Sequence, residues 1–132
     1  DHLLVREIAP DAATNVSQAM AIPPDMIGVD IGPHTIEFFQ EHVAKAKTIF
    51  WNGPMGIFEM PAFSQGSRAV AKAMAEATET GAITIVGGGD SLSVLASTGL
   101  AAKMSHCSTG GGASLELIEG RVLPGLAALA AS

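Results

Sequence analysis

The chain has 132 residues, of which 48% are hydrophobic and 15% charged, a balance typical of one ordinary globular domain and unlike a disordered or fibrous segment. Its net charge is -6 and its lysines are scattered, so the sequence predicts no basic surface for nucleic acid. It contains no uninterrupted apolar run of about 18 residues, and we therefore expect no membrane partner either.

Two further features are the single cysteine, which bears on the location of the protein, and the N-terminal residues. Cys107 is its only cysteine, so no internal disulfide can form, and we expect a reducing, cytoplasmic location. The chain begins at Asp1 without a methionine and reaches an apolar triplet at residues 3–5 almost at once. From this start we expect that the chain was cut from a longer protein.

Short apolar or β-prone runs alternate with helical patterns along the sequence. The runs at 3–5, 48–51, 83–86 and 104–107 predict four strands. Apolar residues at helical spacing predict helices over 35–46 and 67–78, and shorter helices are expected from residue 90, near residue 112 and over 126–130.

This alternation indicates an α/β fold, a Rossmann-like parallel sheet with helices on both faces. Ligands of such sheets bind beyond the carboxyl ends of the strands. We therefore expect the site in the loops that follow three of the strands, at Asn52, Gly87 and Ser108.

The sharpest feature is a strand that runs into three glycines and then a helix start, formed by Gly87, Gly88, Gly89, Asp90 and Ser91. Glycines let the backbone approach a phosphate, and free amides at a helix N-terminus favour an anion. Asp90 would repel a phosphate directly, but a Mg²⁺ ion between the two resolves the conflict. On these residues alone, Asp90 as an ordinary helix N-cap is an equally good interpretation.

A second glycine-rich turn follows the last predicted strand and contains Gly110, Gly111 and Gly112. Together with the first turn it could hold a polyphosphate or a group that moves along it. Neither turn has the lysine of a P-loop or the spacing of the dinucleotide fingerprint. Tight turns between packed elements remain the alternative.

The third feature is the loop after the second strand, residues 50–59, in which apolar residues alternate with glycine and proline. Pro54 and Ile57 could wall a flat base, and Glu59 could accept hydrogen bonds from two sugar hydroxyls. Taken by itself, this loop fits better a capped turn with Trp51 and Phe58 in the core and Glu59 in solvent.

Taken together, these three loops closely resemble, in order and spacing, the C-terminal half of phosphoglycerate kinase. Residues 28–33 and 119–125 are similar to that family as well, so the resemblance covers nearly the whole chain. Met26 stands where the family has a tryptophan. Ser91 stands where the family has a threonine or a serine, so it is an allowed variant.

The resemblance implies a glycolytic phosphotransferase with a carboxyl group as acceptor. It transfers a phosphoryl group between 1,3-bisphosphoglycerate and MgADP, giving 3-phosphoglycerate and MgATP. Asp90 would bind the Mg²⁺ ion, and Gly110 to Gly112 would face the moving phosphoryl group as the catalytic glycines. The nucleotide would be bound by Val29, Asn52, Pro54, Ile57, Glu59, Gly87, Gly88, Gly89, Asp90 and Ser91.

The resemblance also implies that the chain is an incomplete lobe of a two-lobe, monomeric enzyme. Residues 1–122 would belong to the nucleotide-binding lobe, and residues 123–132 would return toward the lobe that binds phosphoglycerate. Because that second lobe and its cations are absent from these 132 residues, we expect the isolated chain to be inactive. A non-catalytic nucleotide-binding module, or an α/β scaffold whose glycines only make turns, would be the alternatives.

Overall fold

The computed structural model describes residues 1–109. In these residues the strands and helices are β1 (His2–Val5), β2 (Asn15–Val16), β3 (Ile27–Ile31), α1 (Pro33–Lys45), β4 (Thr48–Asn52), α2 (Gln65–Glu79), β5 (Ile83–Gly87), α3 (Gly89–Thr98) and β6 (His106–Ser108). Short 3-10 turns lie at Pro61–Phe63 and Ala101–Lys103. The predictions for Gly110 to Gly112, for helices near 112 and over 126–130, and for the tail 123–132 lie outside the described residues.

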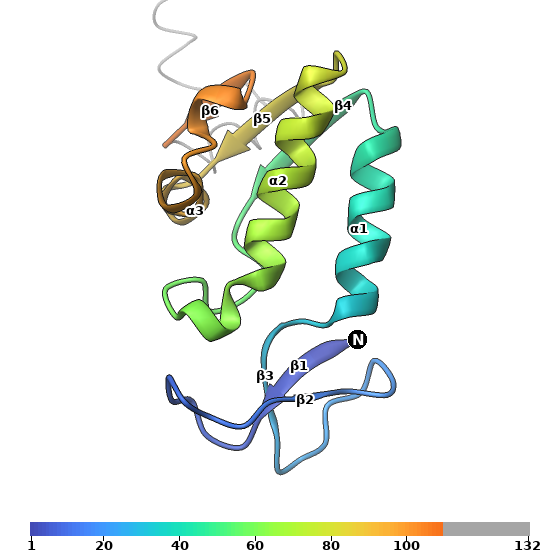
Figure 1. The fold of residues 1–132 in the computed structure, drawn as a ribbon, viewed down its shortest axis with the longest axis vertical. Helices are drawn as coiled ribbons and strands as arrows, with labels where there is room; N and C mark the ends of the chain where they lie inside the picture. Colours follow the sequence, from blue (N-terminus) through green and yellow to red (C-terminus); the bar gives the residue numbers. More distant parts are fainter. Residues whose placement is uncertain (110–132) are drawn as a thin grey trace, which may run out of the picture.

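Three strands form a parallel sheet in the order β4-β5-β6 (Figure 1). They correspond to the predicted strands at 48–51, 83–86 and 104–107, the last of which begins two residues later than expected. Asn52 pairs with Gly87, and Gly87 pairs with Ser108, so the three strands end level with one another. The loops at Asn52, Gly87 and Ser108 therefore leave the sheet at one edge.

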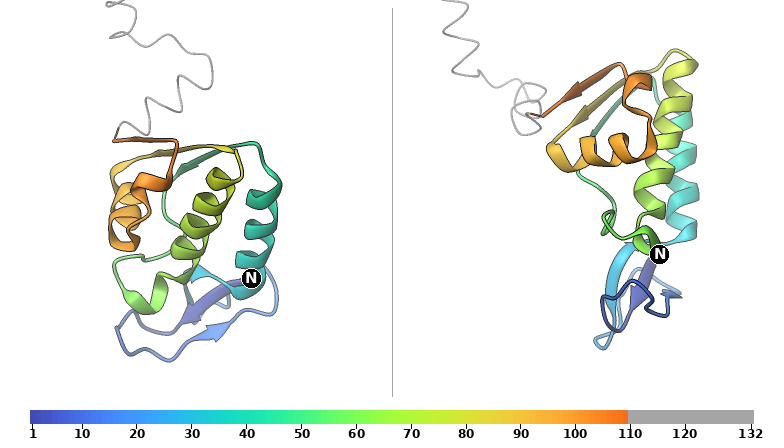
Figure 2. Two further views of the ribbon diagram at one scale, coloured as in Figure 1. Left: turned by 45° about the horizontal axis from the view of Figure 1, so that its top comes forward. Right: turned by 60° about the vertical axis from the view of Figure 1, so that its left-hand side comes forward.

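The described helices cover one face of this sheet, as the right-hand view of Figure 2 shows. Buried residues of α2 and α3 form one core cluster with Trp51 and Val86, and Phe39 and Val43 of α1 pack against it. On the opposite face, Phe50 and Ile85 are half-buried and Ile83 is exposed. The α/β architecture is confirmed, and any helices on that opposite face would lie outside residues 1–109.

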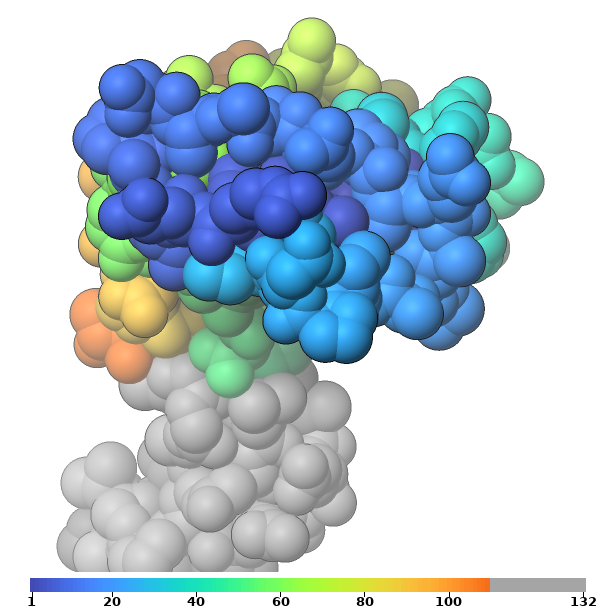
Figure 3. All heavy atoms as spheres, turned by 90° about the horizontal axis from the view of Figure 1, so that it is seen from below, coloured from blue at the N-terminus to red at the C-terminus, as the bar shows by residue number. Residues whose placement is uncertain are grey.

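The predicted strand at 3–5 does form, but not in the parallel sheet. β1 pairs antiparallel with β2 and β3, in a separate sheet of order β2-β1-β3. This sheet lies below the two long helices in Figure 1, and Figure 3 shows its segments, in blue, covering that end of the molecule. The sequence analysis missed β3 because Gly28 and Asp30 interrupt its apolar pattern.

Hydrogen bonds join this second sheet to the helices. α1 begins with Pro33 and its N-cap is Gly32, which has no side chain to cap it. The carboxylate of Asp1 instead accepts hydrogen bonds from the amides of His34, at 3.2 Å, and Thr35, at 2.8 Å.

In residues 1–109 no helix has the length and apolar character needed to cross a membrane.

Candidate functional site

The carboxyl edge of the parallel sheet is built around Gly88. Its amide donates to the carbonyl of Ser108 at 2.9 Å, so the turn after β5 is held by β6. Gly88 has a φ of +89°, a conformation that residues with a side chain rarely adopt. An ideal Cβ there would lie 2.7 Å from Oδ1 of Asn52, which places Asn52 and the glycine turn in direct contact.

The first turn of α3 opens at this edge. Gly88 is its N-cap and no side chain caps the helix, so the interpretation of Asp90 as an N-cap is wrong. The first amides of a helix have no acceptor inside it, and they favour an anion. Gly89 is exposed, with nothing within 4 Å of an ideal Cβ. In the described residues the turn is therefore open to solvent at Gly89.

Asp90 is exposed beside this turn. Its carboxylate makes no hydrogen bond or ion pair with any residue in 1–109. Ser91 differs, because it is fully buried and its Oγ accepts a hydrogen bond of 2.7 Å from the amide of Gly53. Of the two predicted site residues, only Asp90 presents its side chain to solvent.

The loop after β4 runs from this edge to β3. Near its start, the indole of Trp51 donates to the carbonyl of Gly53 at 2.6 Å. Farther on, the amide of Met55 donates to Oγ of Ser67 at 2.9 Å, and the amide of Ile57 donates to the carbonyl of Val29 at 3.0 Å. The loop is thus anchored to α3, α2 and β3 in turn.

Beside β3 lies a hollow of about 430 Å³, lined by His2, Ile22, Gly28, Val29, Asp30, Ile31, Met55, Gly56 and Ile57. Two of the predicted nucleotide-binding residues, Val29 and Ile57, are among them. The side chain of Val29 is only 2% exposed and packs with Val5 and Phe63, so Val29 presents mainly its backbone. Pro54 is half-buried and does not line the hollow.

The interpretation of this loop as part of the core, with Glu59 in solvent, is confirmed. Trp51 is buried in the core, and Phe58 packs against that core. Glu59 is exposed. The loop therefore contributes both to the core and to the wall of the hollow.

Asp30 was not among the site residues predicted from the sequence. This residue is 5% exposed, and its carboxylate accepts hydrogen bonds of 2.8 Å from the amides of Ile31 and Gly66. Burial raises the pKa of Asp30, and the hydrogen bonds from Gly66 and Ile31 only partly oppose this shift. The one signal in the sequence was an acidic residue inside an apolar run just before a Gly-Pro helix start.

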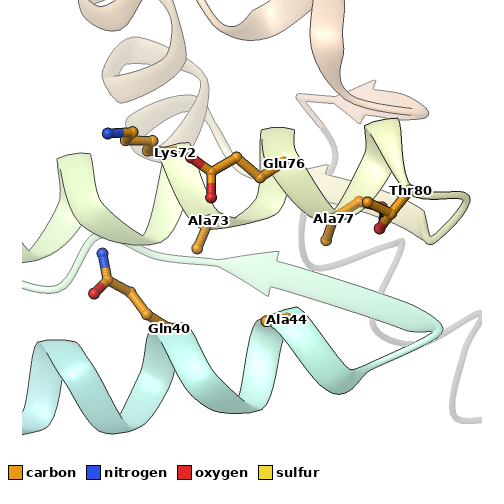
Figure 4. Close-up of a pocket in the computed structure, with 7 residues that line it drawn as sticks. All are labelled: Gln40, Ala44, Lys72, Ala73, Glu76, Ala77 and Thr80. Atoms are coloured by element: carbon orange, nitrogen blue, oxygen red, sulfur yellow. Dashed lines mark hydrogen bonds between the residues drawn. The ribbon is translucent and has the colours of Figure 1, made fainter.

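A second hollow lies elsewhere, between α1 and α2. Figure 4 shows its lining, which is Gln40, Ala44, Lys72, Ala73, Glu76, Ala77 and Thr80. None of the predicted site residues lines this hollow. Its lining also contains neither a glycine turn nor a free helix start.

Comparison with known proteins identifies the family of the chain. The family model described as phosphoglycerate kinase matches residues 1–121. The phosphoglycerate kinases of Chlorobaculum tepidum and Chloroflexus aggregans are each 54% identical to the chain over 129 residues. These matches cover 98% of the chain but 32% of each relative, so the chain spans about a third of their length.

Solved structures give the same result. Phosphoglycerate kinase from Coxiella burnetii is 43% identical, with a TM-score of 0.83 over 92% of this chain and 31% of that one. The enzyme from Pyrococcus horikoshii OT3 is 33% identical, with a TM-score of 0.78 over 97% of this chain and 31% of that one. In sequence and in fold, this chain belongs to the phosphoglycerate kinase family.

Proposed function

We propose that the chain carries the nucleotide side of the phosphoglycerate kinase reaction. That reaction transfers a phosphoryl group between 1,3-bisphosphoglycerate and MgADP, giving 3-phosphoglycerate and MgATP in glycolysis. The observation that supports this proposal most is the open first turn of α3 beside Asn52. Next to it lies the exposed carboxylate of Asp90, which has no partner in residues 1–109.

The phosphates would bind at this turn. The amides of Gly89 and Asp90 and the positive end of α3 are suited to an anion. Gly88 makes the approach possible, since a side chain there would collide with Asn52. Asn52 is exposed at the same edge and would hold a phosphate oxygen through its side-chain amide.

The residues also fit a magnesium ion that arrives with the nucleotide. Residues 1–109 hold no group of three or more His, Cys, Asp or Glu side chains that could cage a metal. Mg²⁺, however, is commonly held by one or two carboxylates together with substrate phosphates, and Asp90 supplies one carboxylate. The bound ion would neutralise charge on the phosphates.

The base and sugar would lie along the loop after β4. The hollow beside Val29 and Ile57 is mainly apolar and has room for a planar base. Residues 52 and 57 are five positions apart and can be at most about 18 Å apart. Phosphate and base sites at the two ends of this loop are therefore within reach of one nucleotide. We place Glu59 at the ribose hydroxyls, because it is exposed just beyond Ile57.

The remaining assignments rest on the family resemblance. Gly110 to Gly112 would face the transferred group. Phosphoglycerate would bind on another lobe, and the full-length enzyme would work as a monomer in the cytoplasm. Since positioning of both substrates can supply about 7 to 11 kcal/mol of the barrier, one lobe alone should not catalyse the transfer.

The test measures ATP formation from 1,3-bisphosphoglycerate and MgADP. The chain is assayed alone and then as a joined enzyme, in which it replaces the matching part of the Chlorobaculum tepidum relative. We expect no turnover from the chain alone and turnover from the joined enzyme. Binding of MgADP without turnover in the joined enzyme would indicate a non-catalytic nucleotide module. Absence of MgADP binding would indicate a scaffold and overturn the proposal.

A further inference from the structure

Asp30 lies where three parts of the fold meet. It belongs to β3, and its Oδ1 atom accepts a hydrogen bond from the next amide, that of Ile31. Its Oδ2 atom accepts a hydrogen bond from the amide of Gly66, in the first turn of α2. One carboxylate thus joins a strand of the antiparallel sheet to a helix that covers the parallel sheet.

The third part is the loop after β4, which lies against Asp30 at Gly56. An ideal Cβ at Gly56 would lie 2.5 Å from the carbonyl oxygen of Val29 and 2.7 Å from Oδ1 of Asp30. A Cβ at Gly66 would also collide with Oδ1 of Asp30. Both glycines are therefore needed for the two segments to approach the carboxylate, and any change in its position would move both.

This arrangement has a cost to stability. Asp30 is 5% exposed and forms no ion pair with a basic side chain in residues 1–109. Its raised pKa means that burial disfavours the charged form more than its two hydrogen bonds favour it. A buried charge kept without a cation beside a hollow is typical of a group that serves the site.

Asp30 and Gly56 both line the hollow beside β3. Next to them, the amide of Ile57 donates a hydrogen bond of 3.0 Å to the carbonyl of Val29. This bond holds the loop against β3 at the wall of the hollow. We propose that Asp30 is a positioning residue for nucleotide binding, which holds β3, the start of α2 and the loop at Gly56 together and so maintains the base-binding hollow. This inference rests on the proposed function.

The test compares Asp30→Asn with the unsubstituted joined enzyme, in the direction that consumes MgATP and 3-phosphoglycerate. An amide has one acceptor oxygen, so one of the two backbone amides would face an NH₂ donor and the loop would shift. We expect KM for MgATP to rise about 5- to 30-fold. The value of kcat at saturating nucleotide, and KM for 3-phosphoglycerate, should stay unchanged.

Thr84→Val is the matched control for stability. The Thr84 hydroxyl is buried on β5 and accepts a hydrogen bond of 3.0 Å from the amide of Ser105, so its removal also leaves a backbone amide without its partner. This variant should lose comparable stability while KM for MgATP stays unchanged. Equal KM values for Asp30→Asn and Thr84→Val would overturn the positioning role.

The two proposals can fail separately. If the unsubstituted joined enzyme does not bind MgATP, the proposed function falls and the role of Asp30 falls with it. If that enzyme binds MgATP and Asp30→Asn binds it equally well, only the role of Asp30 is overturned. Should Asp30→Asn not fold, Gly56→Ala tests the same contact from the loop side. A raised KM for MgATP with unchanged kcat would then support the role, and an unchanged KM would overturn it.

Discussion

Gly88 lies directly against the side chain of Asn52, since an ideal Cβ at Gly88 would be 2.7 Å from Oδ1 of Asn52. Gly88 also has a φ of +89°. The next residue, Gly89, has nothing within 4 Å of an ideal Cβ and no positive φ. Of these two adjacent glycines at one helix start, Gly88 therefore requires a glycine and Gly89 does not. Substitution of each by alanine gives a matched pair of variants.

We expect Gly88→Ala to destabilise the protein by about 1 to 3 kcal/mol, because its backbone conformation suits only glycine and its methyl group would displace Asn52. Gly89→Ala should be neutral or stabilising by about 0.4 to 1 kcal/mol, because the unfolded chain loses freedom and the folded chain has room. Urea unfolding of both variants measures the difference. Equal free energies of unfolding would contradict the contact between Gly88 and Asn52.

Asp90→Ala should remove most of the magnesium dependence of nucleotide binding in the joined enzyme. Loss of one interaction between a charged group and the metal should weaken MgADP binding by about 10- to 100-fold. ADP binding with the metal chelated should change little. Calorimetric titration measures both affinities, with Asp25→Ala as the control because Asp25 is exposed and pairs with Arg6. Unchanged MgADP affinity in a folded Asp90→Ala protein would exclude the metal role.

Glu59→Gln should raise KM for the nucleotide more than it lowers kcat. Glu59 is exposed at the far end of the loop from α3, so it would contribute to binding in the ground state and the transition state equally. Steady-state kinetics of the joined enzyme separate the two effects, and Glu41→Gln on α1 serves as the exposed carboxylate control. A large fall in kcat at saturating nucleotide would show that Glu59 takes part in the chemistry.

Asp30 should make stability fall as the pH rises. Its pKa is raised in the folded state, so between pH 3.8 and that raised value the folded protein holds the proton more tightly than the unfolded protein does. Stability due to this group is therefore greatest below pH 3.8 and is lost as the pH rises through the folded pKa.

The measurement is the difference in free energy of unfolding between wild type and Asp30→Asn across this range. As the pH rises, the free energy of unfolding of the wild type should fall relative to that of the variant, because the variant has no proton to lose at residue 30. A shift in favour of the wild type would mean that its pKa is lowered.

Much of the parallel sheet and its edge followed from local pattern. The β-branched run at 83–86 and the three glycines after it are contiguous, so their strand and turn could be predicted without knowledge of distant residues. Helices α1 and α2 were predicted to within two residues at each end, because their apolar residues recur at helical spacing. The level endings of β4, β5 and β6 then followed from the rule that parallel strands share a carboxyl edge.

The sequence by itself therefore determined the fold class, the helices α1, α2 and α3, and the glycine turn after β5. Only the tertiary structure decided that β1 pairs with β3 rather than with the parallel sheet, since His2 and Ile31 are joined across a long loop and no local pattern names a partner. It also decided that Ser91 is buried and that Asp30 joins β3 to α2. The physical reason is the same in each case: burial of a polar side chain depends on which distant amide reaches it, and that is fixed only when the elements pack.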